Sequence, residues 1–296
     1  MVLTINNISN QLELNNKEAW SLLLPLMLRA KEQKRPKPIV DDRYSSEIAR
    51  QINIDFRSLH LDRHCQIGVA LRTRYLDNLA SIFVITHEHP VIVNLGCELN
   101  MRYQRVCDDL RKRGYNHSET MFSCYDIDRE ETISLRRNIA KETANNTFIS
   151  TSISDKGWMK ELLRKHPYGE FLFICEHALI KIEEQQAFET INSISQTFPI
   201  GTKIFFERTS ARIHPKSLLR SMRINMYYYN MCHYISNWKC NKPATIEQNC
   251  PTLRLDSEYY YMAHAGLRGG IGTLLATLFP AINRMYGIWG FEKIKN

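Results

Sequence analysis

The stretch VIVNLGCELN, residues 91–100, decides the fold of this chain. Its apolar run is typical of a buried strand, and the run ends at Gly96. A glycine there permits a tight turn that brings backbone N–H groups close to a ligand. A second glycine is common two residues later in cofactor-binding turns, but Glu98 stands at that position. A single glycine does not by itself distinguish a cofactor turn from an ordinary strand end.

Downstream of this stretch, strand-like and helix-like segments alternate. Strands are predicted at 91–95, 121–128, 147–153, 169–179 and 202–209, with helices at 102–113, 129–142, 155–166 and 183–198 between them. Such alternation predicts an α/β fold with right-handed crossovers and a mainly parallel sheet covered by helices on both faces.

The remaining segments predict how the chain is organised around this sheet. Residues 1–90 form an N-terminal helical cover, in which Pro25 is expected to break or kink the first helix. Residues 91–210 form the ligand-binding core. Residues 211–268 are rich in Tyr, Met, Asn and Cys and are predicted to be an inserted lid that binds substrate. Residues 269–296 return to the core with a final helix and strand.

Composition favours a soluble globular protein, because 44% of the 296 residues are hydrophobic and 24% are charged. No apolar run is long enough to suggest a membrane span. The first 16 residues lack a basic start followed by an apolar block, so no secretory signal is expected. Eight scattered cysteines without a CxxC motif predict reduced, mostly buried thiols and a cytoplasmic location.

The net charge of +8 raises the question of an anionic partner. The two densest basic clusters, 29–37 and 111–114, are short, which favours solvated helix faces over a nucleic-acid or membrane surface. We therefore expect a small-molecule substrate that is anionic or aromatic, and leave the oligomeric state open. His87-Glu88-His89 has no third ligand nearby, so no metal site is expected.

Polar residues close the predicted strands, and in an open parallel sheet ligands bind at these carboxyl ends. Asp128 can accept hydrogen bonds from the hydroxyls of an adenosine ribose, or it can belong to the start of the following helix. Ser152 and Ile153 can border an adenine, or they can lead into the next helix. Glu176 ends a very apolar strand and needs a partner, either a ligand ammonium or an arginine.

These strand ends lack the several glycines expected of a pyrophosphate site. S-adenosylmethionine carries a ribose and an amino acid but no phosphate, so the pattern favours this cofactor over NAD.

Six segments resemble the leucine carboxyl methyltransferase family, in particular its bacterial branch of polyketide O-methyltransferases. They are LLLPLMLRAKEQKRPKPIVDD (22–42), ALRTRYLDN (70–78), VIVNLGCELNMR (91–102), YDIDREETISLRR (125–137), CEHALIKI (175–182) and LFPAINRMYGIWGFEKI (278–294). The resemblance implies a Rossmann-like class I methyltransferase fold with a seven-stranded sheet.

The resemblance also implies roles for matching positions. Arg72 would pair with the methionine carboxylate of the cofactor, and Gly96 would lie beneath the methionine. Asp128 would hold the ribose, and Ser152 and Ile153 would border the adenine. Glu176 would lie near the amino acid or the reacting centre.

Five positions depart from the family pattern. Glu98 replaces a glycine, Asn100 an aspartate, Met101 a threonine, His177 a glycine and Lys181 a tyrosine. A side chain at position 98 would crowd the cofactor, or its carboxylate would attract the cofactor's ammonium or sulfonium. Glu98 is therefore counted among the predicted cofactor-binding residues.

The predicted reaction is SN2 methyl transfer from S-adenosylmethionine to a carboxylate or phenol of a small natural product. A carboxylate needs no general base, whereas a phenol would need one. His177 is the candidate base, and its alternative is a satisfied core histidine. Two other functions stay open: another S-adenosylmethionine reaction, such as cyclisation or aminocarboxypropyl transfer, and a non-catalytic binding protein.

Overall fold

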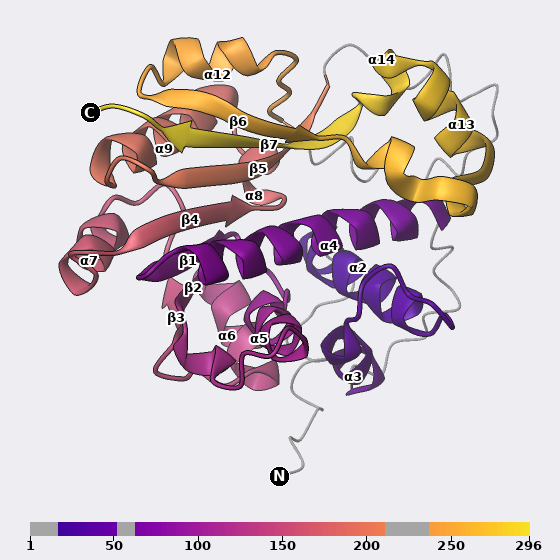
Figure 1. Cartoon of the computed structure of the whole chain (residues 1–296), viewed down its shortest axis with the longest axis horizontal. Coiled ribbons are helices and arrows are strands. Elements are labelled where there is room, and N and C mark those ends of the chain that lie inside the picture. The colour runs from indigo at the N-terminus through magenta and orange to yellow at the C-terminus, as the bar shows by residue number, and fades with distance from the viewer. Residues whose placement is uncertain (1–16, 52–62, 211–236) are drawn as a thin grey trace.

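A computed structural model of the chain describes residues 17–51, 63–210 and 237–296. Its centre is a seven-stranded sheet in the order β3-β2-β1-β4-β5-β7-β6 (Figure 1). The strands are β1 (Pro90–Leu95), β2 (Ser123–Asp128), β3 (Asn146–Ser150), β4 (Glu170–Cys175), β5 (Lys203–Thr209), β6 (Leu253–Tyr259) and β7 (Tyr286–Lys293). The first five run parallel, and β7 pairs antiparallel with β5 and β6. The predicted mainly parallel sheet of seven strands is confirmed.

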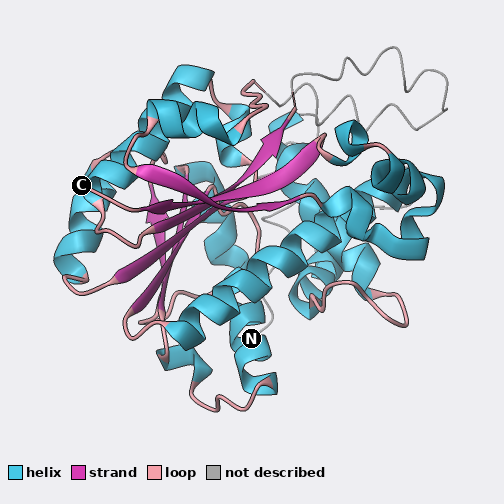
Figure 2. Ribbon diagram, turned by 45° about the horizontal axis from the view of Figure 1, so that its top comes forward, coloured by secondary structure: helices cyan, strands magenta, loops and turns pink. Residues whose placement is uncertain are grey.

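Helices cover both faces of the sheet (Figure 2). One face carries α4 (Arg63–Thr86) and α5 (Arg102–Lys112), and the other carries α7 (Gly157–Lys165) and α9 (Glu184–Thr197). The side chains of β1 point alternately to these two helical layers. Ile92 packs with α4 and α5, while Val91 and Val93 pack with α7 and α9. Every residue of β1 is buried, which is why its sequence is apolar except for Asn94, whose side chain is hydrogen-bonded to Asp126 and Arg102.

Shorter elements complete the core. They are η1 (Ser118–Thr120), α6 (Glu130–Ile139) and α8 (Ala178–Lys181). α6 follows β2 and buries Ile133 against Cys97 and Phe148. α8 follows β4 directly, so it lies at the carboxyl edge of the sheet.

The N-terminal helices α2 (Lys17–Gln33) and α3 (Arg43–Gln51) pack against the turn that follows β1. Leu23 and Leu26 of α2 share one buried cluster with Leu99 and Met101 of that turn. α2 continues through Pro25, so of the two expected effects the break is wrong and the kink stays a prediction. A proline inside a helix costs a backbone hydrogen bond, and the burial of the neighbouring leucines offsets that loss.

The C-terminal region contains α12 (Pro243–Asn249), η2 (Tyr261–Gly269), α13 (Gly270–Leu278) and α14 (Pro280–Asn283) besides β6 and β7. The predicted insertion 211–268 extends too far, because residues 253–259 form the edge strand of the sheet and belong to the core. Most side chains of β6 are at least partly exposed, so the strand has no apolar run to reveal it. Residues 211–236, including the tyrosines 227–229, lie outside the described part, and the substrate role of this region stays a prediction.

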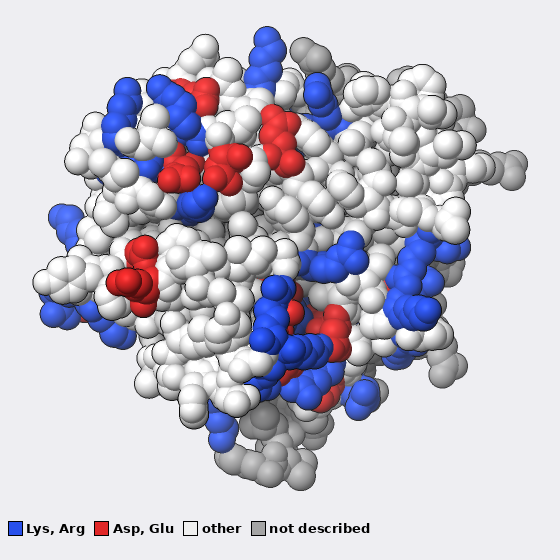
Figure 3. Space-filling model, in the orientation of Figure 1, with Lys and Arg blue, Asp and Glu red and all other residues white. Residues whose placement is uncertain are grey.

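On the face of the molecule in Figure 3, basic and acidic side chains are interspersed. The basic cluster 111–114 is paired with acids: Arg111 with Asp108 and Glu119, Lys112 with Asp41, and Arg113 with Asp109. These pairs agree with the predicted solvated helix face. Among the described helices, none is long and apolar enough to cross a membrane.

Candidate functional site

The strand register brings the predicted site residues to one edge of the sheet. Leu95 of β1 pairs with Ile127 of β2, and Asn94 pairs with Ile174 of β4. Gly96, Asp128 and Glu176 follow at the same level. The strand order reverses between β1 and β4, and this is the position where open α/β sheets bind ligands.

The turn after β1 has two residues in the left-handed backbone region, Gly96 at φ 64° and Glu98 at φ 47°. A Cβ at Gly96 would lie 2.3 Å from the Cβ of Ala178, so the close approach of α8 requires a glycine. Glu98 carries a side chain, so it lacks the conformational freedom of glycine. The left-handed region costs a non-glycine residue about 1–2 kcal/mol. The predicted place of Gly96 beneath the methionine stays a prediction.

Asp128 holds the turn and the start of α6 at the same time. Its Oδ2 accepts the N–H of Glu98 at 2.9 Å, and its Oδ1 accepts the N–H of Arg129 at 2.8 Å. Each carboxylate oxygen has a second lone pair, so the group can also accept ribose hydroxyls. Its part-exposed position agrees with that role, which stays a prediction.

Ser152 and Ile153 follow β3 beside Asp128, since Ser150 pairs with Asp128 in the sheet. Ser152 is exposed, and its hydroxyl accepts the N–H of Ser154 at 3.3 Å. Ile153 is buried in the apolar core on the α7 face. These positions fit both alternatives, the adenine border and the entry to α7.

Glu176 is buried, and its carboxylate is bound by two arginines. It pairs with Arg72 at 3.1 Å and with Arg102, and it accepts a hydrogen bond from Asn100 at 2.8 Å. Burial would raise the pKa of Glu176, but Arg72 and Arg102 outweigh it and hold the pKa far below the usual value. Of the two partners expected for Glu176, the structure therefore contains the arginine.

Arg72 is only 2% exposed and lies between two carboxylates. Besides Glu176 it pairs with Glu207 at 2.9 Å, and its Nη1 lies 2.9 Å from Nε2 of His177. A cofactor carboxylate would be a third anion at this guanidinium. The role of Arg72 in binding the methionine carboxylate stays a prediction.

His177 makes two contacts through the same nitrogen, and they require opposite protonation states. Nε2 lies 2.9 Å from the Arg72 guanidinium, which can only donate, and 3.2 Å from Glu207. Burial lowers the pKa of His177 most, and the charge of Arg72 lowers it further, to well below its usual value. We therefore take the ring as neutral, with Nε2 accepting a hydrogen bond from Arg72. While that hydrogen bond lasts, Nε2 is not available to take a proton from a substrate.

Glu98 and Lys181 form an ion pair at 2.6 Å across this edge of the sheet. Their side chains are 13% and 27% exposed, so the pair reaches solvent at the carboxyl edge of the sheet between β1 and β4. Burial raises the pKa of Glu98 and Lys181 opposes that shift. Two positions that depart from the family pattern are therefore partners of one another.

Sequence reasoning missed the arginines and acids behind this edge. Arg102 contacts Asp77 and Asn94, and Arg105 contacts Asp77, Asp42 and Asn100. Arg102 lies two residues after Asn100, at the end of the segment 91–102 that carries the family resemblance. Its position there was the sequence signal that could have placed an arginine at this edge. Arg29 also pairs with Asp42, at 2.9 Å. The network then holds four arginines (Arg29, Arg72, Arg102 and Arg105) and four carboxylates (Asp42, Asp77, Glu176 and Glu207), and this balance of charge is why so many can be buried.

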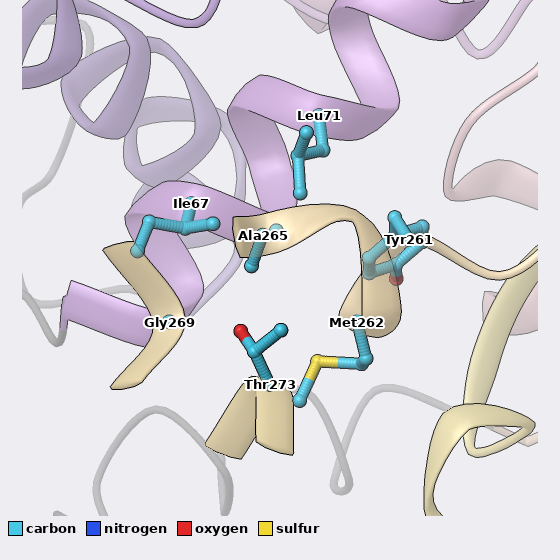
Figure 4. Close-up of a pocket in the computed structure, with 8 residues that line it drawn as sticks. Ile67, Leu71, Tyr261, Met262, Ala265, Gly269 and Thr273 are labelled. Atoms are coloured by element: carbon cyan, nitrogen blue, oxygen red, sulfur yellow. The ribbon is translucent and has the colours of Figure 1, made fainter. Parts of the chain in front are cut away.

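A small apolar pocket lies apart from this edge (Figure 4). It is lined by residues of α4, η2 and α13, among them Leu71, Tyr261 and Thr273. Its volume of about 10 Å³ is that of roughly one water molecule, which leaves no room for a substrate. The Tyr261 hydroxyl points away from it to Glu207, at 2.9 Å.

The sheet order and the site at its reversal define the Rossmann-like class I methyltransferase fold. The solved structure of a proposed methyltransferase from Thermobifida fusca YX has the same fold, with a TM-score of 0.56 over 86% of this chain and 95% of that chain at 10% identity. No family model matches the chain.

Two named methyltransferases are similar in sequence to this chain. The tetracenomycin polyketide synthesis O-methyltransferase TcmP of Streptomyces glaucescens is 23% identical over 242 residues, 81% of each chain. The S-adenosyl-L-methionine-dependent methyltransferase dpfgK of Gibberella zeae is 28% identical over 153 residues, 48% of each chain. The predicted resemblance to polyketide O-methyltransferases is thus confirmed. Together with the fold, these similarities support the predicted enzyme class, an S-adenosylmethionine-dependent methyltransferase, and the predicted cofactor.

Proposed function

We propose that this chain is an S-adenosylmethionine-dependent O-methyltransferase that acts on a carboxylate of a small natural product. The observation that carries the proposal is the similarity to TcmP over 81% of both chains, with the strand-end residues gathered at one edge of the sheet. When bound, the cofactor supplies a methyl group to an acceptor oxygen. We further propose that the protein is cytoplasmic, which agrees with the free thiols of all seven described cysteines.

A carboxylate acceptor is favoured over a phenol by the state of His177. A phenol needs a general base, and Nε2 of His177 is the predicted one. This nitrogen accepts a hydrogen bond from Arg72, and its pKa is lowered by burial and by that guanidinium. A carboxylate is ionised at neutral pH and needs only to be positioned in line with the methyl group.

The other residues at this edge of the sheet bind the cofactor and position the site. Asp128 accepts the ribose hydroxyls, while Ser152 and Ile153 border the adenine. Glu176 is fixed at this edge of the sheet by Arg72 and Arg102. A buried, paired network of this kind holds its side chains rigidly, and rigid placement is what an in-line transfer requires.

The test uses cofactor labelled in its methyl group, with a matched acid and phenol such as 1-naphthoic acid and 1-naphthol. Mass analysis identifies the products, and dilute alkali then separates a methyl ester, which is hydrolysed, from a methyl ether, which is not. We expect an alkali-labile methyl label on the acid. An alkali-stable label on the phenol would contradict the carboxylate assignment. Release of methylthioadenosine in place of S-adenosylhomocysteine would point to the alternative reactions.

A further inference from the structure

The carboxylate of Glu98 and the ammonium of Lys181 meet at the carboxyl edge of the sheet, between β1 and β4. Glu98 lies in the turn after β1, and Lys181 lies in α8 after β4. The two groups are 2.6 Å apart and partly exposed. They hold one negative and one positive charge at the place where the methionine end of the cofactor would enter.

That end of the cofactor is a zwitterion with one ammonium and one carboxylate. We propose that Glu98 and Lys181 form a clamp for it, in which Glu98 receives the ammonium and Lys181 receives the carboxylate. The inference rests on the proposed function, because it assumes that S-adenosylmethionine binds at this edge. Without ligand, the two side chains satisfy one another, and on binding each exchanges its partner for the opposite charge of the ligand.

Three observations favour these residues over Arg72. The Arg72 guanidinium is 2% exposed and contacts two carboxylates, whereas the Lys181 side chain is 27% exposed and pairs with Glu98. A lysine is also a flexible point charge that can turn from one partner to another. The third observation is the backbone of Glu98.

Glu98 keeps a left-handed conformation, at φ 47°, in which a glycine would be relaxed. Strained residues of this kind gather where a side chain has a task in binding. In this backbone conformation the Glu98 side chain reaches Lys181 of α8, at 2.6 Å. The ion pair with Lys181 is thus made by a residue whose backbone conformation costs local stability.

The clamp is tested by isothermal titration calorimetry with two ligands. S-adenosylhomocysteine carries the amino acid, and methylthioadenosine carries the same adenosine and thioether without it. In Lys181→Met and Glu98→Gln we expect the affinity for S-adenosylhomocysteine to fall about tenfold or more, since charged hydrogen bonds are lost. The affinity for methylthioadenosine should change by less than about twofold.

Lys203→Met is the matched control. Lys203 pairs with Asp256 at 2.8 Å and with Glu292 at 3.2 Å, its side chain is 25% exposed, and it lies at the amino end of β5. This variant loses both of these ion pairs and should bind both ligands like the wild type. Lys181→Arg should recover most of the lost affinity.

Two failures are distinguishable. If the wild type binds S-adenosylhomocysteine but Lys181→Met and Glu98→Gln bind it equally well, the clamp is wrong and the proposed cofactor stands. If the wild type binds neither ligand, the proposed function itself fails. Unfolding midpoints of all variants, measured in urea, show that each protein is folded.

Discussion

Replacing Glu98 by glycine and by alanine separates its backbone strain from its ion pair. Both variants lose the carboxylate, so both lose the contact with Lys181 at 2.6 Å. Only alanine keeps a Cβ in the left-handed region at φ 47°. The difference in the free energy of unfolding between the two variants therefore reports the backbone alone.

The size of that difference follows from two opposing effects. The left-handed region costs alanine about 1–2 kcal/mol that glycine escapes. Glycine loses more freedom on folding, which costs about 0.4–1 kcal/mol. We expect Glu98→Gly to be more stable than Glu98→Ala by about 0.5–1 kcal/mol, the reverse of the order in a helix or strand.

Urea unfolding at equilibrium, followed by circular dichroism, measures both variants. Glu189 is the control position, because it is an exposed glutamate within α9. There the glycine variant should be less stable than the alanine variant by about 1 kcal/mol. If Glu98→Ala proves as stable as Glu98→Gly or more stable, the turn is not strained, and the structural argument for the clamp weakens.

Further predictions concern the charges behind the turn. Arg72→Met should destabilise the protein by about 3–5 kcal/mol in urea, because Glu176 and Glu207 lose a buried partner; a loss below about 1 kcal/mol would contradict the network. The pKa of His177 lies well below its usual value of 6.5 in the folded chain, so its contribution to stability is present above pH 6.5 and is lost on acidification. Between pH 7.5 and 5.5 the wild type should lose more stability in urea than His177→Asn, and equal losses would show that the ring is not held neutral. Asp128→Ala should abolish calorimetric binding of both S-adenosylhomocysteine and methylthioadenosine, unlike the clamp variants, and unchanged affinity for both would refute the ribose assignment.

The sequence by itself determined the strands of the parallel sheet and the residues at their ends. Buried strands read as apolar runs, and a run is a local property of the chain. The carboxyl ends of parallel strands meet at one edge, so the run that ends at Gly96 and the acid at Asp128 already predicted a site there. The family resemblance added Arg72 to that site and supplied the positions from which Glu98 and Lys181 depart.

Only the tertiary structure decided which charges are partners. Glu98 and Lys181 are 83 residues apart in the chain, and Arg72 and His177 are 105 apart. Periodicity carries no information over such distances, because the contact depends on where β4 is inserted beside β1. The edge strand β6 was missed for a related reason. A strand whose side chains are mostly exposed has a weak hydrophobic pattern, so its place in the sheet becomes evident only from its pairing with β7.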